Sequence, residues 1–359
     1  MDKNYADRRW FTVTVAVLVG LLAALACLCI YIDPFIHYHK PLNGYAYYSV
    51  KNEAYVNDGI IRKYDFTGII TGTSMSENFN TSQAEQLFGG SFIKIPLAGT
   101  TFCEVSDQLS RVYARGKNPE IVIRSLDPDL FIMDKDKSYH DYSDIRYIYN
   151  DNPFDDIKYL CNLDVFADYT LEILRNRLPD GQPGMDFDKY CAWECQTGKD
   201  IILSKYIEGP KAKEEKVFTE YDKKITLENV CQNLTSVADD HPETTFFYFI
   251  SPYSIFYWKN LNDDKSIKRN IEAEKIAVEE MLRHPNIKLF AFSDNFDLIC
   301  DLNNYKDYRH YTPEINSLIL KWMSEGKNLL SPDNYHAYFD KLDRFYSSYD
   351  YSELMQTGD

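Results

Sequence analysis

The most apolar part of the chain is the run 10–32, WFTVTVAVLVGLLAALACLCIYI, which contains no charged residue. A helix needs roughly 20 such residues to cross the hydrocarbon core of a bilayer. Three basic residues precede the run, Lys3, Arg8 and Arg9, and such charges favour retention on the cytoplasmic side. We therefore predict a cytoplasmic segment at 1–9, a single-pass anchor in the cell membrane at 10–32, and an extracellular C-terminal domain.

A removable signal peptide is the alternative interpretation of this apolar run. No A-x-A site followed by polar residues closes it, and apolar residues continue past Ala26. A lipoprotein signal ending at Cys27 would need a recognition box that Ala24-Leu25-Ala26 matches poorly. We therefore interpret the run as an uncleaved anchor.

After a turn-rich linker at 33–60, short apolar runs alternate with amphipathic stretches. The runs typical of buried strands are Phe66–Ser74, Ser91–Gly99, Glu120–Asp127, Thr244–Ser251 and Ile287–Asp294. Helical periodicity occurs between or before them, at Ser76–Phe88, Glu104–Arg115, Thr226–Ala238 and Lys268–Leu282. This alternation predicts an α/β domain over 61–359, with a central, mostly parallel sheet of about five strands.

Two helices with apolar stripes follow the last predicted strand. Thr312 is a good N-cap, Pro313 fits the first helical position, and Gly326 ends the first of these helices. The second is predicted to start at Ser331-Pro332. Both stripes are interpreted as core packing.

More than a hundred residues separate the third predicted strand from the fourth, which is too long for a simple crossover. We therefore predict an insertion at about 134–225, which includes the sequences DKDKSYHDYSD and CAWEC. The insertion either caps the active site or decorates the surface, and the sequence leaves both possibilities open.

The cysteines do not indicate a metal site. Cys191 and Cys195 in CAWEC resemble half of one, but no second Cys or His pair stands at a zinc-like spacing. Six cysteines lie outside the anchor, and an even number in an oxidising compartment permits disulfides whose pairing the sequence leaves open.

The formal charge of −16 argues against nucleic acid as a partner, because phosphate binding needs a basic surface. The same negative charge argues against binding of the predicted extracellular domain to anionic lipids, because like charges repel. The 29 tyrosines suit stacking on sugars, although an AT-rich genome would also favour tyrosine.

Candidate chemistry lies where predicted strands end, because open parallel sheets bind ligands beyond their carboxyl ends. The first strand ends in Gly72-Thr73-Ser74 and is predicted to pass straight into a helix, whose free N–H groups would attract an oxyanion. Gly99 follows the second strand and can offer a further N–H. Taken alone, Ser74 could equally be an N-cap and Gly99 an ordinary turn residue.

Asp307 and His310 precede the Thr312 helix. A serine nucleophile needs a base to take its proton, and that base needs an acceptor to fix its tautomer. An aspartate three residues before a histidine can reach its Nδ1 atom and leave Nε2 for the serine. A surface turn with a chance D-x-x-H pattern is the alternative.

The chain thus has G-T-S-M after the first strand, a glycine after the second, and D-x-x-H before the Thr312 helix. These motifs resemble, in the same order, the conserved blocks of the SGNH (GDSL-like) hydrolase superfamily. The segments YIDPFIHYH, ITGTSMSENF and NNYKDYRHYTPEIN are similar to a membrane-anchored branch found in Gram-positive bacteria. That branch is similar in layout to the teichoic-acid D-alanylation protein and the alginate O-acetyltransferases. The resemblance extends from about residue 30 to 330, without the insertion, and implies a three-layer flavodoxin-like fold.

The resemblance implies Ser74 as nucleophile, His310 as base and Asp307 as its orienting acid. Gly99 and the Ser74 N–H would be oxyanion donors, and no cofactor or metal is implied. The family's asparagine after the third strand is missing, so Ser125 or a backbone N–H would replace it. Thr73 also stands where many relatives have aspartate.

The expected activity is that of an extracytoplasmic serine acyltransferase or esterase, acting on an acyl ester of a cell-envelope polysaccharide or polyol. The triad alone does not distinguish transfer to a hydroxyl from hydrolysis. The anchor favours transfer beside a membrane-bound O-acyltransferase, a partner suggested by analogy. A catalytically inactive surface binding or scaffold protein with the same fold is the alternative.

Overall fold

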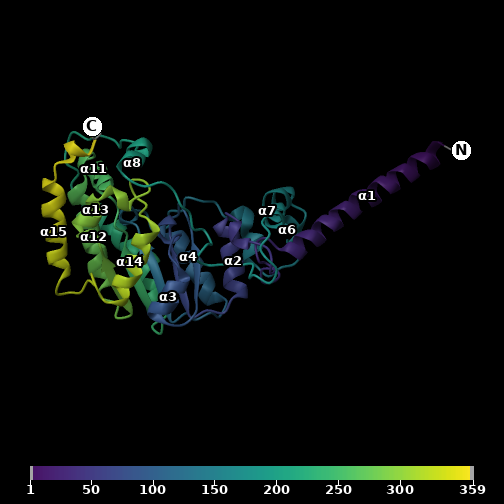
Figure 1. Ribbon diagram of the computed structural model, residues 1–359, viewed down its shortest axis with the longest axis horizontal. Coiled ribbons are helices and arrows are strands. Elements are labelled where there is room, and N and C mark those ends of the chain that lie inside the picture. Colours follow the sequence, from purple (N-terminus) through teal and green to yellow (C-terminus); the bar gives the residue numbers. More distant parts are fainter. Residues whose placement is uncertain (1–2, 356–359) are drawn as a thin grey trace. The chain divides into compact units, whose positions relative to one another are not determined.

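The computed structural model describes residues 3–355 and divides into two compact units (Figure 1). Unit 1 comprises Met1–Tyr64 and Asp141–Asp186, and unit 2 comprises Asp65–His140 and Phe187–Asp359. This division differs from the linear order expected for a domain at 61–359 with one insertion. The middle of the expected insertion forms a unit with the N-terminal segment, whereas the part after residue 186 belongs with the sheet.

Unit 1 begins with the long apolar helix α1, Lys3–Ile32. Its segment Asp7–Ile32 is long and apolar enough to cross a membrane. The remaining helices of this unit are short, and they are η1 (Tyr47–Ser49), α2 (Glu53–Lys63), η4 (Ser143–Ile145), α5 (Arg146–Tyr149), α6 (Ile157–Leu160), the π-helical η5 (Val165–Thr170) and α7 (Leu171–Arg175).

The chain after α1 turns around the buried carboxylate of Asp33. This carboxylate accepts the backbone N–H groups of the three residues that follow the turn, His37, Tyr38 and His39, at 3.0, 2.7 and 2.9 Å. The Tyr159 hydroxyl donates to it at 2.9 Å. The first part of the predicted linker, residues 33–39, is therefore a compact turn fixed by one aspartate.

Unit 2 contains a five-stranded, all-parallel sheet in the order β2-β1-β3-β4-β5. Its strands are β1 (Gly68–Gly72), β2 (Phe92–Pro96), β3 (Ile121–Leu126), β4 (Thr245–Ile250) and β5 (Ile287–Ala291). Nearly every strand residue is buried, as expected for a parallel sheet covered on both faces. The five predicted strands are thus confirmed, each shorter than its apolar run.

The helices of unit 2 pack in groups. Helix α3 contacts α14, and α12 contacts both α9 and α15 (Figure 1). In chain order the helices are η2 (Ser74–Ser76), α3 (Thr81–Phe88), α4 (Phe102–Ala114), η3 (Pro128–Leu130), α8 (Lys199–Lys205), α9 (Glu220–Val230), the π-helical η6 (Cys231–Thr235), α10 (Ser236–Asp240), α11 (Ile255–Asp263), α12 (Ile267–Met281), α13 (Phe296–Cys300), η7 (Leu302–Asn304), α14 (Pro313–Ser324), α15 (Tyr335–Ser348) and η8 (Tyr351–Met355).

The prediction that β1 passes straight into a helix is wrong. Ser74 opens a single 3₁₀ turn, and α3 begins only at Thr81. Between them the buried ammonium of Lys94 on β2 binds the carbonyl oxygens of Glu77 and Phe79. Because these carbonyls are held by a side chain, the loop 77–80 is stable without helical hydrogen bonds.

Candidate active site

The candidate nucleophile Ser74 lies at the carboxyl end of β1. Gly72 ends this strand with a φ of +134°, and a Cβ there would lie 2.0 Å from the hydroxyl oxygen of Ser125 on β3. Only glycine therefore lets the two strands approach where the chain turns toward Ser74. The next residue, Thr73, accepts the Met75 N–H at 3.4 Å and donates its hydroxyl hydrogen to the buried carboxyl of Asp127.

The candidate base lies on a chain reversal between α13 and α14. The Lys306 N–H donates to the His310 carbonyl at 2.8 Å, and Tyr305 and Tyr311 form an antiparallel bridge. Both tyrosines are buried. Because side chains alternate along an extended segment, Lys306 and His310 share the opposite side.

The structure brings Ser74, His310 and Asp307 into one hydrogen-bonded chain. The Ser74 Oγ lies 2.7 Å from His310 Nε2, although 236 residues separate them in sequence. The His310 Nδ1 lies 2.7 Å from Asp307 Oδ2. With Nδ1 protonated, the imidazole donates to Asp307 and its Nε2 accepts the serine hydroxyl hydrogen.

Asp307 is held as a carboxylate. Its Oδ1 accepts the backbone N–H groups of Arg309 and His310 at 2.8 and 2.9 Å. Burial alone would raise the pKa of Asp307, but the hydrogen bonds from the His310 ring and from these two amides hold it below its usual value. An ionised acceptor at this position fixes the tautomer of the imidazole.

The two predicted oxyanion residues differ in their surroundings. Ser125 is buried at the end of β3, and its hydroxyl makes no hydrogen bond within residues 3–355, so it retains a free donor beside Gly72. Gly99 lies on the exposed loop between β2 and α4 with a φ of +64°. The predicted contribution of an α-helix N-terminus at Ser74 is wrong, because the chain forms only a short 3₁₀ turn there.

Trp193, in the middle of CAWEC, is a residue of this site that the sequence did not indicate. Its indole packs against the His310 imidazole, with ring centroids 5.3 Å apart and an interplanar angle of 76°. The Lys306 ammonium donates to the Trp193 carbonyl at 2.7 Å. No spacing rule marks a lone tryptophan in a long insertion, and the flanking Cys191 and Cys195 indicated no site at this position.

A polar cleft of about 620 Å³ lies next to the chain reversal that carries Asp307 and His310. It is lined by Glu194, Cys195, Thr197, Asn303, Asn304, Lys306, Thr312, Pro313 and Glu314. A hydrogen bond from Thr312 lowers the pKa of Glu314, so this side chain is ionised at neutral pH. The lining suits hydroxyl groups and does not suit a hydrocarbon chain.

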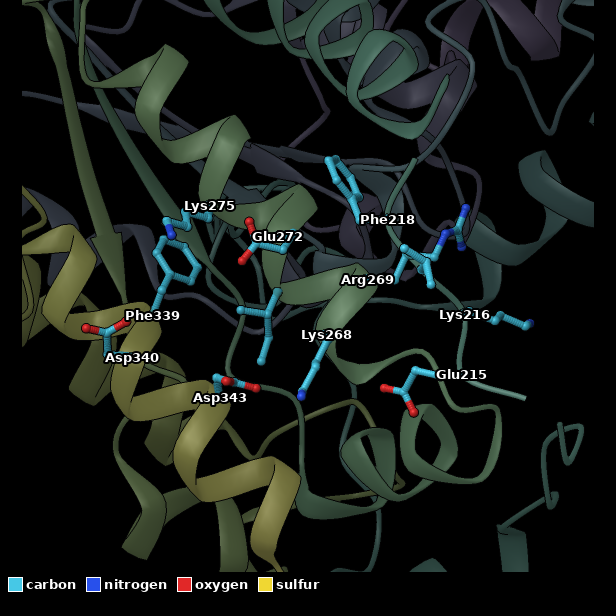
Figure 2. A pocket seen from close by; sticks show the side chains of 12 residues that line it. Glu215, Lys216, Phe218, Lys268, Arg269, Glu272, Lys275, Phe339, Asp340 and Asp343 are labelled. Atoms are coloured by element: carbon cyan, nitrogen blue, oxygen red, sulfur yellow. The ribbon is translucent and has the colours of Figure 1, made fainter. Parts of the chain in front are cut away.

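None of the predicted site residues lines the polar cleft itself, and none lines a second cavity of unit 2, of about 320 Å³ (Figure 2). It lies against α12 and α15, and side chains of both charges surround it, among them Lys268, Glu272 and Asp343. Among residues 3–355, no group of three or more His, Cys, Asp or Glu side chains is placed to hold a metal ion.

All eight cysteines, from Cys27 to Cys300, are free thiols, so no disulfide fixes the site.

No family model and no curated protein matches this chain, and the site is therefore interpreted from its geometry.

Proposed function

We propose that this protein is an extracytoplasmic serine acyltransferase or esterase with an SGNH-like fold. The hydrogen-bonded chain Ser74–His310–Asp307, with both links at 2.7 Å, carries this proposal. The strand order 2-1-3-4-5 supports it, because this order is that of flavodoxin-like sheets, which bind ligands at the carboxyl ends of their strands.

In the proposed reaction, His310 Nε2 takes the hydroxyl proton of Ser74 as Oγ attacks the acyl carbon of the donor ester. The imidazolium is stabilised by Asp307, and the negative oxygen of the tetrahedral intermediate is stabilised by N–H or O–H donors. The Ser74 N–H, the Gly99 N–H and the Ser125 hydroxyl are the proposed donors.

His310 then gives the proton to the leaving alcohol, and the acyl group stays on Ser74. In the second half of the reaction an acceptor hydroxyl, or water, attacks the acyl carbon while His310 takes its proton. Ser74 leaves as the alkoxide and recovers its proton from His310, which restores the resting state.

The proposed acceptor is a hydroxyl of a cell-envelope polysaccharide or polyol. The polar cleft next to the chain reversal, lined by Lys306 and Glu314 among others, supports a hydroxyl-bearing ligand. Helix α1, as a membrane anchor with the rest of the chain outside, would keep the reaction close to the membrane. A membrane-bound O-acyltransferase that delivers the acyl group is a proposed partner.

A catalytically inactive SGNH-fold binding or scaffold protein is the second candidate, favoured by the absence of an asparagine after β3. Labelling of membranes with a fluorophosphonate probe separates the two. We expect the wild type to be labelled and Ser74→Ala to be unlabelled at equal abundance. Absence of Ser74-dependent labelling in the folded protein would favour the scaffold.

Transfer and hydrolysis are separated by product analysis. With p-nitrophenyl acetate as donor and glycerol as acceptor, a transferase forms glycerol acetate at the expense of free acetate. An esterase gives free acetate at an unchanged rate as the glycerol concentration rises.

A further inference from the structure

We propose that Trp193 is a positioning residue that fixes two turns of the active site relative to each other. The nucleophile turn comprises residues 74–78, and the base turn comprises residues 305–311. This inference rests on the proposed function, because it assigns Trp193 a part in the action of the same triad. Trp193 comes from neither turn. It belongs to the segment after residue 186, in the predicted insertion, and contacts both turns.

The first set of contacts fixes Trp193 to the nucleophile turn. Its indole Nε1–H donates to Glu77 Oε2 at 2.7 Å, and its backbone N–H donates to Asn78 Oδ1 at 3.0 Å. Glu77 and Asn78 directly follow the 3₁₀ turn that Ser74 opens. A shift of Trp193 would therefore move the chain that carries the nucleophile.

The second set of contacts fixes Trp193 to the base turn. The ammonium of Lys306 lies 2.7 Å from the Trp193 carbonyl oxygen and 3.8 Å from the centroid of the indole ring. Lys306 is buried, precedes Asp307, and is paired through its backbone with His310. A cation on the face of an indole is attracted by the negative charge of the ring, so the ring contributes to this attachment.

The indole also restricts the imidazole directly. The edge-to-face contact, with ring centroids 5.3 Å apart, places the indole against the His310 ring and limits its rotation. His310 must point Nδ1 at Asp307 and Nε2 at Ser74 at the same time, and a rotated ring would lose both bonds. A small displacement of catalytic groups can reduce turnover by about a hundredfold.

The segment that carries Trp193 has an attachment of its own. Asp188 accepts the Thr81 hydroxyl at 2.9 Å and the Ser82 N–H at 3.0 Å, at the start of α3. Because these bonds do not involve the indole, removal of the Trp193 side chain leaves the segment attached. We therefore expect Trp193 variants to fold.

The test compares Trp193→Ala and Trp193→Phe in the full chain, reconstituted in nanodiscs, with p-nitrophenyl acetate as substrate. We expect Trp193→Ala to lower kcat about 10- to 100-fold and to leave KM within about threefold, because a positioning residue affects the geometry of the triad more than the binding of a small ester. Phenylalanine keeps a ring against His310 and Lys306 but loses the hydrogen bond to Glu77, so it should restore only part of the kcat. Trp322→Ala on α14, which removes a half-buried tryptophan elsewhere in unit 2, is the matched control and should leave kcat unchanged.

Unchanged kcat in Trp193→Ala, or an equal loss in Trp193→Ala and Trp193→Phe with a raised KM, would overturn the inference. A spectroscopic test does not depend on turnover. Protonation of His310 beside the indole should quench the fluorescence of Trp193, and this pH-dependent component should disappear in both Trp193→Phe and His310→Ala. The wild type could show this pH-dependent fluorescence change without Ser74-dependent labelling by the fluorophosphonate probe. In that case the proposed catalytic function is wrong, whereas the contact between Trp193 and His310 is supported.

Discussion

At the scale of single residues, two departures from the expected family pattern are partners of each other. Thr73 stands where the SGNH pattern that the sequence resembles often has aspartate, and Asp127 lies near the position of the asparagine that this pattern has after the third strand. In the structure the Thr73 hydroxyl donates to the Asp127 carboxyl. The two positions are far apart in the sequence, and only the fold shows that their side chains contact each other beside the turn that carries Ser74.

Asp307 is the residue whose removal tests the triad most selectively. Asp307→Asn keeps the size of the side chain but removes the charge that stabilises the imidazolium, and its amide can favour the wrong tautomer. We expect kcat to fall by about 10²- to 10⁴-fold, measured with p-nitrophenyl acetate. An asparagine variant with wild-type kcat would exclude Asp307 from the reaction.

Asp127 predicts a specific dependence of stability on pH. Burial, followed by repulsion from Asp129, raises the pKa of Asp127 to about 6. Since its pKa is raised on folding, Asp127 favours the folded state below about pH 4, and this contribution disappears as pH rises through about 6. A rise of about two units corresponds to about 3 kcal/mol.

Urea unfolding at pH 4 and pH 7 measures this contribution. The free energy of unfolding of the wild type, relative to Asp127→Asn, should fall by about 3 kcal/mol between the two pH values. Other titrating groups are common to both proteins and cancel in the difference. A difference that does not change with pH would show that Asp127 titrates normally.

At the scale of elements, the sequence predicted the strands better than the connections. Each parallel strand is an apolar run that is buried on both faces, so its composition alone identifies it. The helix α11, Ile255–Asp263, was missed, and the predicted helix Thr226–Ala238 contains a π-helical segment, η6, which its periodicity did not indicate. Trp193 was missed because its contacts form only on folding, whereas Ser74 and the pair at 307 and 310 are marked by their place at strand ends and before a helix.

Lys94 shows how a buried charge determines a connection. It lies in the middle of β2, is fully buried, and binds the carbonyls of Glu77 and Phe79. Lys94→Met should leave these carbonyls without a partner and lower the free energy of unfolding by about 1–3 kcal/mol. Glu77 directly follows the turn that carries Ser74, so loss of the Lys94 contact should also disturb that turn. We therefore expect the fluorophosphonate probe to label Ser74 more slowly in this variant.

The exposed lysine of β5 provides the matched control. Lys288→Met removes an ammonium from a strand without uncovering buried carbonyls. Chemical denaturation of both variants separates the two effects. Equal stability of the Lys94 and Lys288 variants would mean that the loop 77–80 does not depend on its buried cation.

At the scale of the whole molecule, the chain combines one apolar helix with an α/β unit that carries the candidate site. Helix α1 ends at Ile32, the last residue of the uncharged apolar run, and the charged Asp33 follows it directly. The Asp33 carboxylate accepts three backbone N–H groups of the turn that comes next, so the folded part of unit 1 begins immediately after the apolar helix.

The proposed topology can be tested with thiol chemistry in intact cells. Cys231 is exposed on unit 2, and a variant in which it is the sole cysteine should react with a membrane-impermeant maleimide added outside. A variant with only Cys27, on α1, should stay unlabelled because its thiol would lie in the bilayer. Labelling of Cys231 only after permeabilisation would place unit 2 in the cytoplasm.

The order of the site residues along the chain affects when reactivity arises during translation. All five strands are complete by Ala291, and Ser74 is made long before that, but the base arrives only at His310. If the proposed triad is correct, a chain that terminates before His310 has every strand and Ser74 but no base. We expect such a truncated chain to be unreactive toward esters, so premature termination would yield inactive copies.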